Sequence, residues 1–490
     1  MTFQNLDFAV FFAVLVPVYW ALPQRWRNLL LLGASYVFYG WVHPWFVALI
    51  VAATLVDYAS ALGMATWPRY RKACLWLVIV SNVGLLGFFK YFGFFVGSIS
   101  GVLAAAGWQV PRPVLNVALP VGISFYTFQA MGYVIDVYWR RARARTSLVD
   151  VAAFIAFFPS LLAGPIMRAS NLLAQVEGER RFSAAAARDA TVLVVWGLFK
   201  KLVIADNVGV IADKVFALKA PEFYVLWAGV FAFGIQLYAD FSAYADIARG
   251  AAKWLGFDLI KNFEHPYLAK GPADFWRRWN IGLSTWFRDY VFLPVAYRIS
   301  DRLTADRQFV LDAATRAYVG GMMMAMLTAG LWHGASWNFV LWGAYHGVLL
   351  AVARILGAGR GRRRRTRRWL VPARIAGMFL LANVGWLLFR ETEAGALARD
   401  LSLSPLRSTV LGRQTGAYLF SLAFLYSIPL WVQSVWAELG GPDLVSAMIR
   451  DESRPDARKV AAQAVVAGVL FTAILVLRST TSLDFIYFRF

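Results

Sequence analysis

The chain has 490 residues, of which 60% are hydrophobic and only 16% are charged. Ordinary soluble chains carry roughly 25% charged residues, so this composition cannot provide the polar surface that a water-soluble fold needs. The mean hydropathy of +0.56 agrees with this reading. These values exclude a secreted enzyme, a cytosolic globular protein, a disordered chain and a disulfide scaffold. They predict an all-α polytopic membrane protein.

The charge is strongly positive, because 49 Lys and Arg residues face 28 Asp and Glu residues, giving +21. In a soluble protein this excess would suggest nucleic-acid binding. Here the basic residues gather in short segments between apolar runs, which is typical of cytoplasmic loops. No nucleic-acid-binding motif accompanies them, so we expect no nucleic-acid partner. The single cysteine, Cys74, allows neither an internal disulfide nor a cysteine-rich metal site, and no metal is expected.

Apolar runs of membrane-crossing length recur along the whole chain. The first lacks a preceding Lys or Arg and a small-residue cleavage site, so we expect it to remain as a span. Segment 73–106 could form two short spans or one bent span plus a re-entrant piece, and Lys90 in its middle suggests a break. Segments 149–167 and 272–297, interrupted by polar and Pro/Gly residues, are predicted to be re-entrant or interfacial. The other predicted spans are 7–22, 28–42, 45–64, 117–138, 190–210, 222–240, 317–333, 336–357, 373–391, 416–436 and 462–478.

Six basic segments predict the orientation of these spans. If 73–106 crosses the membrane once, all six lie on one side, which the positive-inside rule makes cytoplasmic. Both termini are then expected on the non-cytoplasmic side. Segment 358–372 contains the strongest basic block and is predicted to be a cytoplasmic polybasic loop near anionic lipid head groups, with binding of an anionic donor as the alternative. The six are Arg25/Arg27, Arg69/Arg71/Lys72, Arg140/Arg141/Arg143/Arg145, 277–316, 360–368 and Arg450–Lys459.

Two of the four histidines lie in or beside predicted spans, where an ionisable side chain is a functional-site candidate. His333 ends an apolar run and precedes Gly334, and His346 precedes Gly347 in the next span. Glycine allows close backbone approach at both places. At 1.5 Å per residue the two histidines could differ in depth by roughly 15 Å, so they need not touch. A helix-packing hydrogen bond is the alternative role for each.

Segment 274–290 combines aromatic and apolar residues at helical spacing with Arg277, Arg278 and Arg288. One interpretation is an amphipathic helix at the membrane interface. The other is a cytoplasmic-side wall that holds an anionic, nucleotide-containing ligand by guanidinium hydrogen bonds and ring stacking.

Polar residues also end the predicted span 222–240, where Tyr238, Asp240, Ser242 and Asp246 follow one another closely. Without further context this group is compatible with a proton or cation path in a transporter. No metal-ligand spacing, phosphate-binding loop or nucleophile elbow occurs elsewhere in the sequence.

Several motifs follow one another in a fixed order between about residues 119 and 347. They are Leu119–Gln129, Phe158-Pro159, Ala163–Ile166, Tyr238–Asp246, Asn262-Phe263, His265–Tyr267, Phe275–Asn280, Trp286–Tyr290, Trp332–Gly334, Trp342-Gly343 and His346-Gly347. Together they resemble the membrane-bound O-acyltransferase family, in the bacterial branch of alginate O-acetylase and the membrane subunit of peptidoglycan O-acetyltransferase. The resemblance implies one integral membrane domain over 1–490, with its catalytic core at 119–347. It also implies a ring of about 11–13 tilted transmembrane helices, with re-entrant segments around a thin centre.

The resemblance further implies an O-acyltransferase whose donor is an acyl thioester, here acetyl-CoA, with no permanently bound cofactor. His333 matches the family's general base, which takes a proton from the acceptor hydroxyl. Asn280 would orient the acyl group or polarise its carbonyl. His346 would support these two residues from behind or lie on the acceptor side of the site. The residues expected to bind the donor are Trp276, Arg277, Arg278, Arg288 and Asp289, and those expected to line the channel are Tyr238, Asp240 and Ser242.

The last residues, 484–490, resemble the aromatic tail of related bacterial acyl-transfer systems. This implies that Tyr487 carries the acyl group and reaches His333 from the non-cytoplasmic side, with an interfacial aromatic anchor as the alternative. The sequence predicts no soluble extracytoplasmic domain that could hold a long glycan. We therefore expect a periplasmic or extracytoplasmic SGNH/esterase-like acetyltransferase as partner, and an envelope polysaccharide such as alginate or peptidoglycan as acceptor.

At two places the sequence differs from the usual motifs of this branch of the family, and both differences weaken the prediction of a particular acceptor. Leu293–Arg298 stands where the branch usually has a Pro-Leu-Gly-Gly-like turn, and Asn280 stands where close relatives often have His. The alternative function is a transporter or flippase in which Asp240, Asp246 and His346 form a polar path. Inverted repeats would favour transport, and the sequence shows none.

Overall fold

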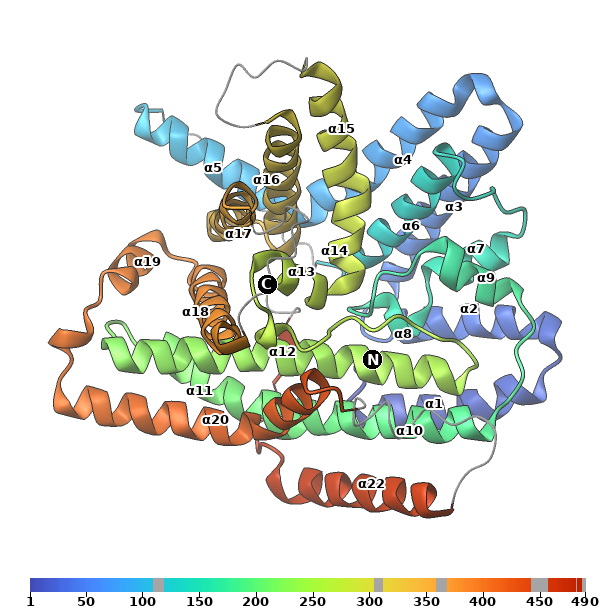
Figure 1. Ribbon diagram of the computed structural model, residues 1–490. Coiled ribbons are helices and arrows are strands. Elements are labelled where there is room, and N and C mark those ends of the chain that lie inside the picture. The colour runs from blue at the N-terminus through green and yellow to red at the C-terminus, as the bar shows by residue number, and fades with distance from the viewer. Residues whose placement is uncertain (109–118, 304–311, 358–367, 442–456, 482, 487–490) are drawn as a thin grey trace. The chain divides into compact units, whose positions relative to one another are not determined.

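The computed structural model describes residues 1–108, 119–303, 312–357, 368–441, 457–481 and 483–486 (Figure 1). Within these ranges every regular element is a helix, which confirms the predicted all-α class. The chain forms two compact units: Met1–Ala190 with Ile247–Ile260, and Thr191–Asp246 with Lys261–Phe490. Most of the predicted polybasic loop, over 358–367, lies outside the described residues, and so does Tyr487.

Helices α10 (Ala184–Phe199) and α12 (Phe223–Trp254) run from one unit into the other. The first unit also contains α1 (Leu6–Ala21), α2 (Gln24–Gly40), α3 (Trp45–Thr66), η1 (Pro68–Tyr70), α4 (Arg71–Leu86), η2 (Gly87–Tyr91), α5 (Phe92–Ala105), α6 (Ile123–Tyr138), α7 (Leu148–Ile155), α8 (Phe158–Leu161), η3 (Ala169–Leu173) and α9 (Ala174–Glu177). The second unit also contains η4 (Lys200–Ala205), α11 (Asp206–Phe216), η5 (Pro266–Leu268), α13 (Pro272–Arg278), α14 (Ile281–Phe287), η6 (Arg288–Phe292), α15 (Leu293–Arg302), α16 (Ala313–His333), α17 (Trp337–Ile355), η7 (Arg368–Leu370), α18 (Val371–Arg390), α19 (Ala394–Leu401), η8 (Pro405–Arg407), α20 (Val410–Glu438) and α22 (Ala457–Leu477).

The predicted spans are helical over most of their described residues, because long apolar runs satisfy their backbone hydrogen bonds internally only as helices. The predicted span 190–210 runs through α10, η4 and α11, and the predicted span 117–138 is helical from Ile123. In the described part of the chain, six helical stretches are long and apolar enough to cross a membrane by length and composition. They are Trp45–Thr66, Pro68–Ala105, Phe223–Trp254, Trp337–Ile355, Val371–Arg390 and Val410–Glu438.

The stretch that the sequence left open, 73–106, is one continuous helical path of 38 residues from Pro68 to Ala105. The expected break at Lys90 is a π-helical turn, Gly87–Tyr91, that joins α4 to α5 without interrupting the helix. The structure thus describes this stretch as one continuous, irregular helix, and it is one of the six candidate spans.

The interpretation of 274–290 as one amphipathic helix is wrong, because the helix ends at Arg278 and a second one starts at Ile281. Asn280 between them has a left-handed backbone with φ 42° and ψ 59°, a conformation that Asn tolerates better than most residues. Asn262 then caps the new helix: its backbone carbonyl accepts from Ile281 N–H, and its side-chain Oδ1 accepts from Gly282 N–H, both at 2.9 Å. This satisfies two N–H groups that a helix start leaves without intrahelical partners.

Helices α16 and α17 form a close hairpin and lie side by side (Figure 1). Glycines allow this approach: a Cβ at Gly330 would overlap the Phe339 carbonyl, and one at Gly343 would overlap the Met326 carbonyl. Small residues at helix contacts are the usual means of close packing in membrane proteins. The hairpin places His333, at the end of α16, next to the start of α17.

Because a backbone atom opposes Gly343, Gly343→Ala is expected to force the two helices apart. We expect a loss of about 1–3 kcal/mol in stability, measured as a lower thermal midpoint of the detergent-solubilised protein. Gly84→Ala in α4 is the matched control, since a Cβ there meets nothing within 4 Å. An unchanged midpoint for Gly343→Ala would contradict the close hairpin.

Candidate active site

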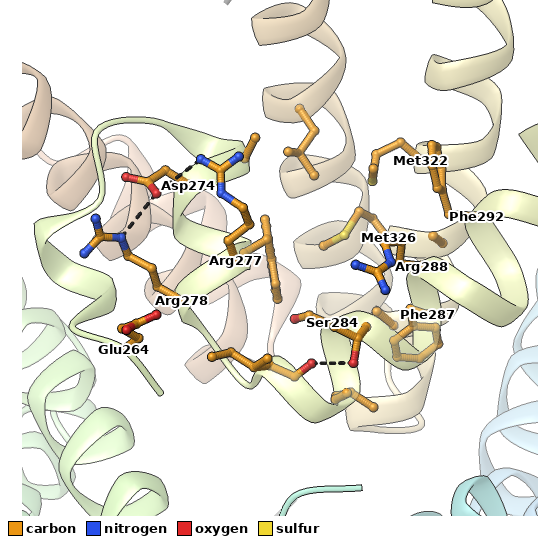
Figure 2. A pocket seen from close by; sticks show the side chains of 18 of the residues that line it. Glu264, Asp274, Arg277, Arg278, Ser284, Phe287, Arg288, Phe292, Met322 and Met326 are labelled. Atoms are coloured by element: carbon orange, nitrogen blue, oxygen red, sulfur yellow. Dashed lines mark hydrogen bonds and ion pairs between the residues drawn. The ribbon is translucent and has the colours of Figure 1, made fainter. Parts of the chain in front are cut away.

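A cavity of about 840 Å³ lies in the second unit (Figure 2). This volume is in the usual range of ligand pockets, about 300–1,000 Å³. Its walls come from segment 261–292, from α16 and α17, and from the end of α20. In Figure 2, Glu264, Asp274, Arg277 and Arg278 gather on one side, and Phe287, Arg288, Phe292, Met322 and Met326 on the other. The cavity therefore offers one strongly charged side and one largely apolar side.

Arg278 is fixed in this wall by two carboxylates. Its Nε lies 3.2 Å from Asp274 Oδ1, and its Nη1 lies 3.1 Å from Glu438 Oε2, at the end of α20. Burial favours a higher pKa for Asp274, but the Lys270 N–H and the Arg278 guanidinium outweigh it and hold that pKa below its usual value. Asp274 and Arg278 are therefore both charged at neutral pH. The Arg278–Glu438 pair ties α13 to α20.

Arg277 and Arg288 are placed differently, because their side chains are 72% and 58% exposed. Arg277 lies 3.3 Å from Asp274 and Arg288 lies 2.8 Å from Asp289. A guanidinium has five N–H donors, so one ion pair leaves donors for a ligand. These two side chains are the best placed in the cavity lining to bind an anion that enters it.

His333 lines the cavity from the end of α16 and is 6% exposed. Its ring packs edge-on against Trp342 at 4.9 Å and against Phe389 at 5.2 Å, measured between ring centroids. Gly334 makes room for the Phe339 ring, which a Cβ there would overlap, and Phe339 packs in turn against Phe389. The imidazole is thus held by aromatic walls while it borders a space large enough for a substrate.

Asn280 is 3% exposed and is not among the residues that line the cavity, although its neighbour Ile281 is. Its backbone carbonyl accepts from Ser284 N–H at 2.8 Å. Its side-chain Nδ2 is buried and has no hydrogen-bond partner within the described chain. An unpaired buried amide donor is costly, which makes it available to a group that enters the site.

Two substitutions separate the backbone role of Asn280 from its side-chain role. Asn280→Gly keeps the left-handed backbone and is expected to fold normally, whereas Asn280→Val should lose about 1–2 kcal/mol. If the amide contacts the acyl group, Asn280→Gly loses acyl transfer at unchanged thermal midpoint. Full activity of Asn280→Gly would contradict the predicted role, and the measurements are turnover of an acyl donor and thermal unfolding.

His346 lies on α17, is 1% exposed, and does not appear in the cavity lining. Its ring lies parallel to Phe275 and meets Trp276 and Trp342 edge-on at 5.2 and 4.9 Å. Neither ring nitrogen has a hydrogen-bond partner in the described chain. The two histidines both contact Trp342, so the structure brings them to one aromatic cluster, with Trp276 between His346 and the cavity.

The residues predicted to line a channel lie on α12. Asp240 pairs with Lys201 at 3.1 Å, and Ser242 accepts from Lys200 Nζ at 2.9 Å. The Tyr238 ring packs against Phe263 and Tyr267. None of these three predicted residues borders the cavity described above, and the channel role stays a prediction.

Sequence reasoning gave no role to Lys200, Lys201, His265 or Glu438. His265 lines the cavity, and its Nδ1 lies 3.0 Å from Ser434 Oγ. Two adjacent lysines inside the apolar run 190–210 are a usable signal, since ionisable residues at membrane depth are expensive. Glu438 meets Arg278 across 160 positions of sequence, and no local pattern indicates that contact.

Comparison with known proteins decides the family. The profile described as "MBOAT, membrane-bound O-acyltransferase family" matches residues 139–375, which include most of the cavity lining. A Pseudomonas putida protein named "Probable alginate O-acetylase AlgI" is 35% identical over 513 residues, covering 99% of both chains. The chain belongs to the membrane-bound O-acyltransferase family. It is a multi-pass membrane O-acyltransferase, as the sequence predicted.

Two further relatives are similar to this O-acyltransferase over a smaller part of its length. The Helicobacter pylori protein named "Peptidoglycan O-acetyltransferase" is 32% identical, covering 75% of this chain and 71% of its own. The Bacillus subtilis protein named "Teichoic acid D-alanyltransferase" is 24% identical, covering 61% of this chain and 74% of its own. The similarity is thus greater, in identity and in coverage of this chain, to the two proteins named for acetyl transfer.

Proposed function

We propose that this O-acyltransferase takes an acetyl group from cytoplasmic acetyl-CoA and passes it across the membrane to hydroxyl groups of an extracytoplasmic polysaccharide. The observation that carries the proposal is the position of His333, in the wall of a cavity that also presents Arg277 and Arg288. A candidate base and anion-binding side chains at one cavity are what transfer from a phosphate-bearing thioester requires.

His333 would act as general base. Its neutral imidazole takes the proton of the acceptor hydroxyl while that oxygen attacks the thioester carbonyl. The new C–O ester bond forms, the C–S bond breaks, and the imidazolium returns the proton to the leaving thiolate of CoA. The Asn280 amide would donate to the carbonyl oxygen as negative charge develops there, after a small adjustment that brings it to the cavity.

The phosphates of acetyl-CoA would bind at Arg277 and Arg288, while Arg278 keeps the wall in shape through Asp274 and Glu438. A hydrogen bond to a charged group contributes about 1.5–3 kcal/mol. Arg288→Gln is therefore expected to raise KM for acetyl-CoA about tenfold or more with little change in kcat. Steady-state kinetics with Lys219→Gln as a surface-charge control measure this, and an unchanged KM would remove Arg288 from the donor site.

The names of the relatives support one class of acceptor. Those named for acetyl transfer are named for alginate and for peptidoglycan, and both are polysaccharides. We propose an envelope polysaccharide here too, reached through a periplasmic or extracytoplasmic SGNH/esterase-like partner. Tyr487, bonded to Ile486, would receive the acetyl group as an ester before it passes to that partner. We propose that the protein lies in the inner membrane with both termini on the non-cytoplasmic side, as the distribution of basic segments predicts.

A sided assay tests the direction of transfer. The purified protein is reconstituted in lipid vesicles, and its orientation is determined from protease cleavage of the loop 358–372. Acetyl-CoA is then supplied on one face only, and formation of free CoA thiol is measured. We expect CoA formation only when the donor is on the face that carries this loop. CoA formed from the opposite face would contradict a cytoplasmic donor site.

A further inference from the structure

A buried lysine at the start of η4 holds three partners at once. Lys201 Nζ lies 2.9 Å from Asp206 Oδ1 and 3.1 Å from Asp240 Oδ1, and it donates to the Leu483 carbonyl at 2.9 Å. All three charged side chains are at most 5% exposed. Segment 483–486, near the end of the sequence, is thus joined directly to an ion cluster inside the second unit.

The same cluster holds the segment a second time, because Asp240 Oδ2 accepts from Ile486 N–H at 2.7 Å. We name Lys201 and Asp240 the clamp and residues 483–486 the held segment. Two further hydrogen bonds lead into it: Asn207 Nδ2 donates to the Leu477 carbonyl at 3.0 Å, and Ser479 N–H donates to the Leu202 carbonyl at 3.1 Å. These two hydrogen bonds attach the backbone of 477–479 to α11 and η4, just before the held segment contacts α12.

Side-chain packing fixes the held segment as well. The Phe485 ring contacts Tyr244 and Phe241, with ring centroids 5.0 and 5.8 Å apart, and Ile486 is 1% exposed. Gly209 leaves room for Leu483, since a Cβ there would overlap that side chain. Burying three charges is expensive unless each is paired, and a hydrophobic core would often be as stable. A buried clamp is therefore better explained by the need for one defined position than by stability.

An unbroken series of ring contacts joins the held segment to His333. Successive centroids are 4.8 to 6.2 Å apart along Phe485, Phe241, Phe263, Trp279, Trp386, Phe389 and His333. Trp279 immediately precedes Asn280, so the series also passes the second residue of the candidate site. Packed interiors transmit small displacements, and a shift of the held segment would reach both residues.

We propose that Lys201 and Asp240 are positioning residues for acyl transfer. They fix the held segment on α12. The fixed segment determines the position from which the chain continues to Tyr487, and it supports the aromatic series that ends at His333. This inference rests on the proposed function. It assigns the clamp a role in the reaction, beyond that of an ion pair that only stabilises the fold.

The neighbouring ion pair provides a matched control. Lys200 Nζ pairs with Asp246 Oδ2 at 2.7 Å and is 3% exposed, on the same two elements, η4 and α12. Asp240→Leu and Asp246→Leu each remove one carboxylate from a buried lysine. Asp240→Leu also removes the acceptor of Ile486 N–H, so we expect it to release the held segment more than Asp246→Leu does.

The experiment combines hydrogen exchange with acetyl transfer in the full-length protein in detergent, using acetyl-CoA as the probe. Asp240→Leu is expected to increase amide exchange in peptides covering 483–486 and to reduce acetyl transfer roughly 10- to 100-fold. Asp240→Asn keeps an acceptor for Ile486 N–H and should retain activity within about threefold and near-normal exchange. Phe485→Ala, which leaves the ion cluster intact, should lower activity and raise exchange like Asp240→Leu.

The outcomes are separable. If Asp246→Leu reduces transfer as much as Asp240→Leu, or if Asp240→Leu is fully active while exchange at 483–486 rises, the clamp is only structural and the inference is overturned. Normal exchange at 483–486 in Asp240→Leu would also overturn it. If the wild-type protein does not turn over acetyl-CoA, the proposed function fails instead, and the exchange data alone then decide whether the clamp holds the segment.

Discussion

His333→Ala is expected to reduce acetyl transfer from acetyl-CoA by about 10²- to 10⁴-fold, which is the usual contribution of a general base. His333 borders the cavity, and the sequence resemblance predicts that it is the general base. Its ring is fixed by Trp342 and Phe389, so the imidazole is held in place before substrate enters. The measurement is the rate of CoA thiol formation at saturating acetyl-CoA.

Two controls separate catalysis from folding in this experiment. Removing the ring also removes aromatic packing, so His333→Gln is made as well, because it keeps more side-chain volume without the base. Both variants should lose activity while their thermal midpoints differ. His43→Ala, in the first unit and exposed, should stay active. Activity of His333→Gln within about threefold of wild type would contradict the assignment of His333 as base.

Lys201→Met is expected to cost about 3–5 kcal/mol of stability, because it leaves Asp206 and Asp240 buried without their shared cation. Removing one partner of a buried ion cluster costs more than the cluster itself contributes. The readout is the thermal midpoint of the detergent-solubilised protein, followed by intrinsic tryptophan fluorescence.

Lys200→Met is the matched control for this prediction. Lys200 is equally buried, but the Asp246 carboxylate with which it pairs is partly exposed, and Lys200 also donates to the Ser242 hydroxyl. Its removal should therefore lower the midpoint clearly less than Lys201→Met. Equal midpoints for the two variants would contradict the view that Lys201 neutralises two carboxylates.

The helices could be predicted from sequence because each apolar run has to satisfy its backbone hydrogen bonds internally in lipid. The helix break at Asn280 could not, since the aromatic spacing of 274–290 continues through it. That break depends on Asn262, which lies 18 positions earlier and caps the second helix through the fold. Local periodicity carries no information about such a partner.

In the candidate site, too, some residues could be predicted from the sequence and some contacts could not. His333 and the arginines could be found from residue type, motif order and position beside an apolar run. The pairing of Arg278 with Glu438 and of Lys201 with Asp240 joins segments far apart in the sequence. The contact between Asp240 and Ile486 spans 246 positions, so only the folded chain shows that the α12 carboxylate holds the end of the described chain.

The central claim is that an acetyl group from acetyl-CoA is transferred at His333 and passes onto the chain at Tyr487. Intact-protein mass analysis after incubation with acetyl-CoA tests it most directly, comparing wild type, His333→Ala and Tyr487→Phe. We expect one added acetyl group on the wild-type protein and none on either variant. An acetyl group retained in His333→Ala would contradict the catalytic role of His333, and one retained in Tyr487→Phe would contradict transfer through that tyrosine.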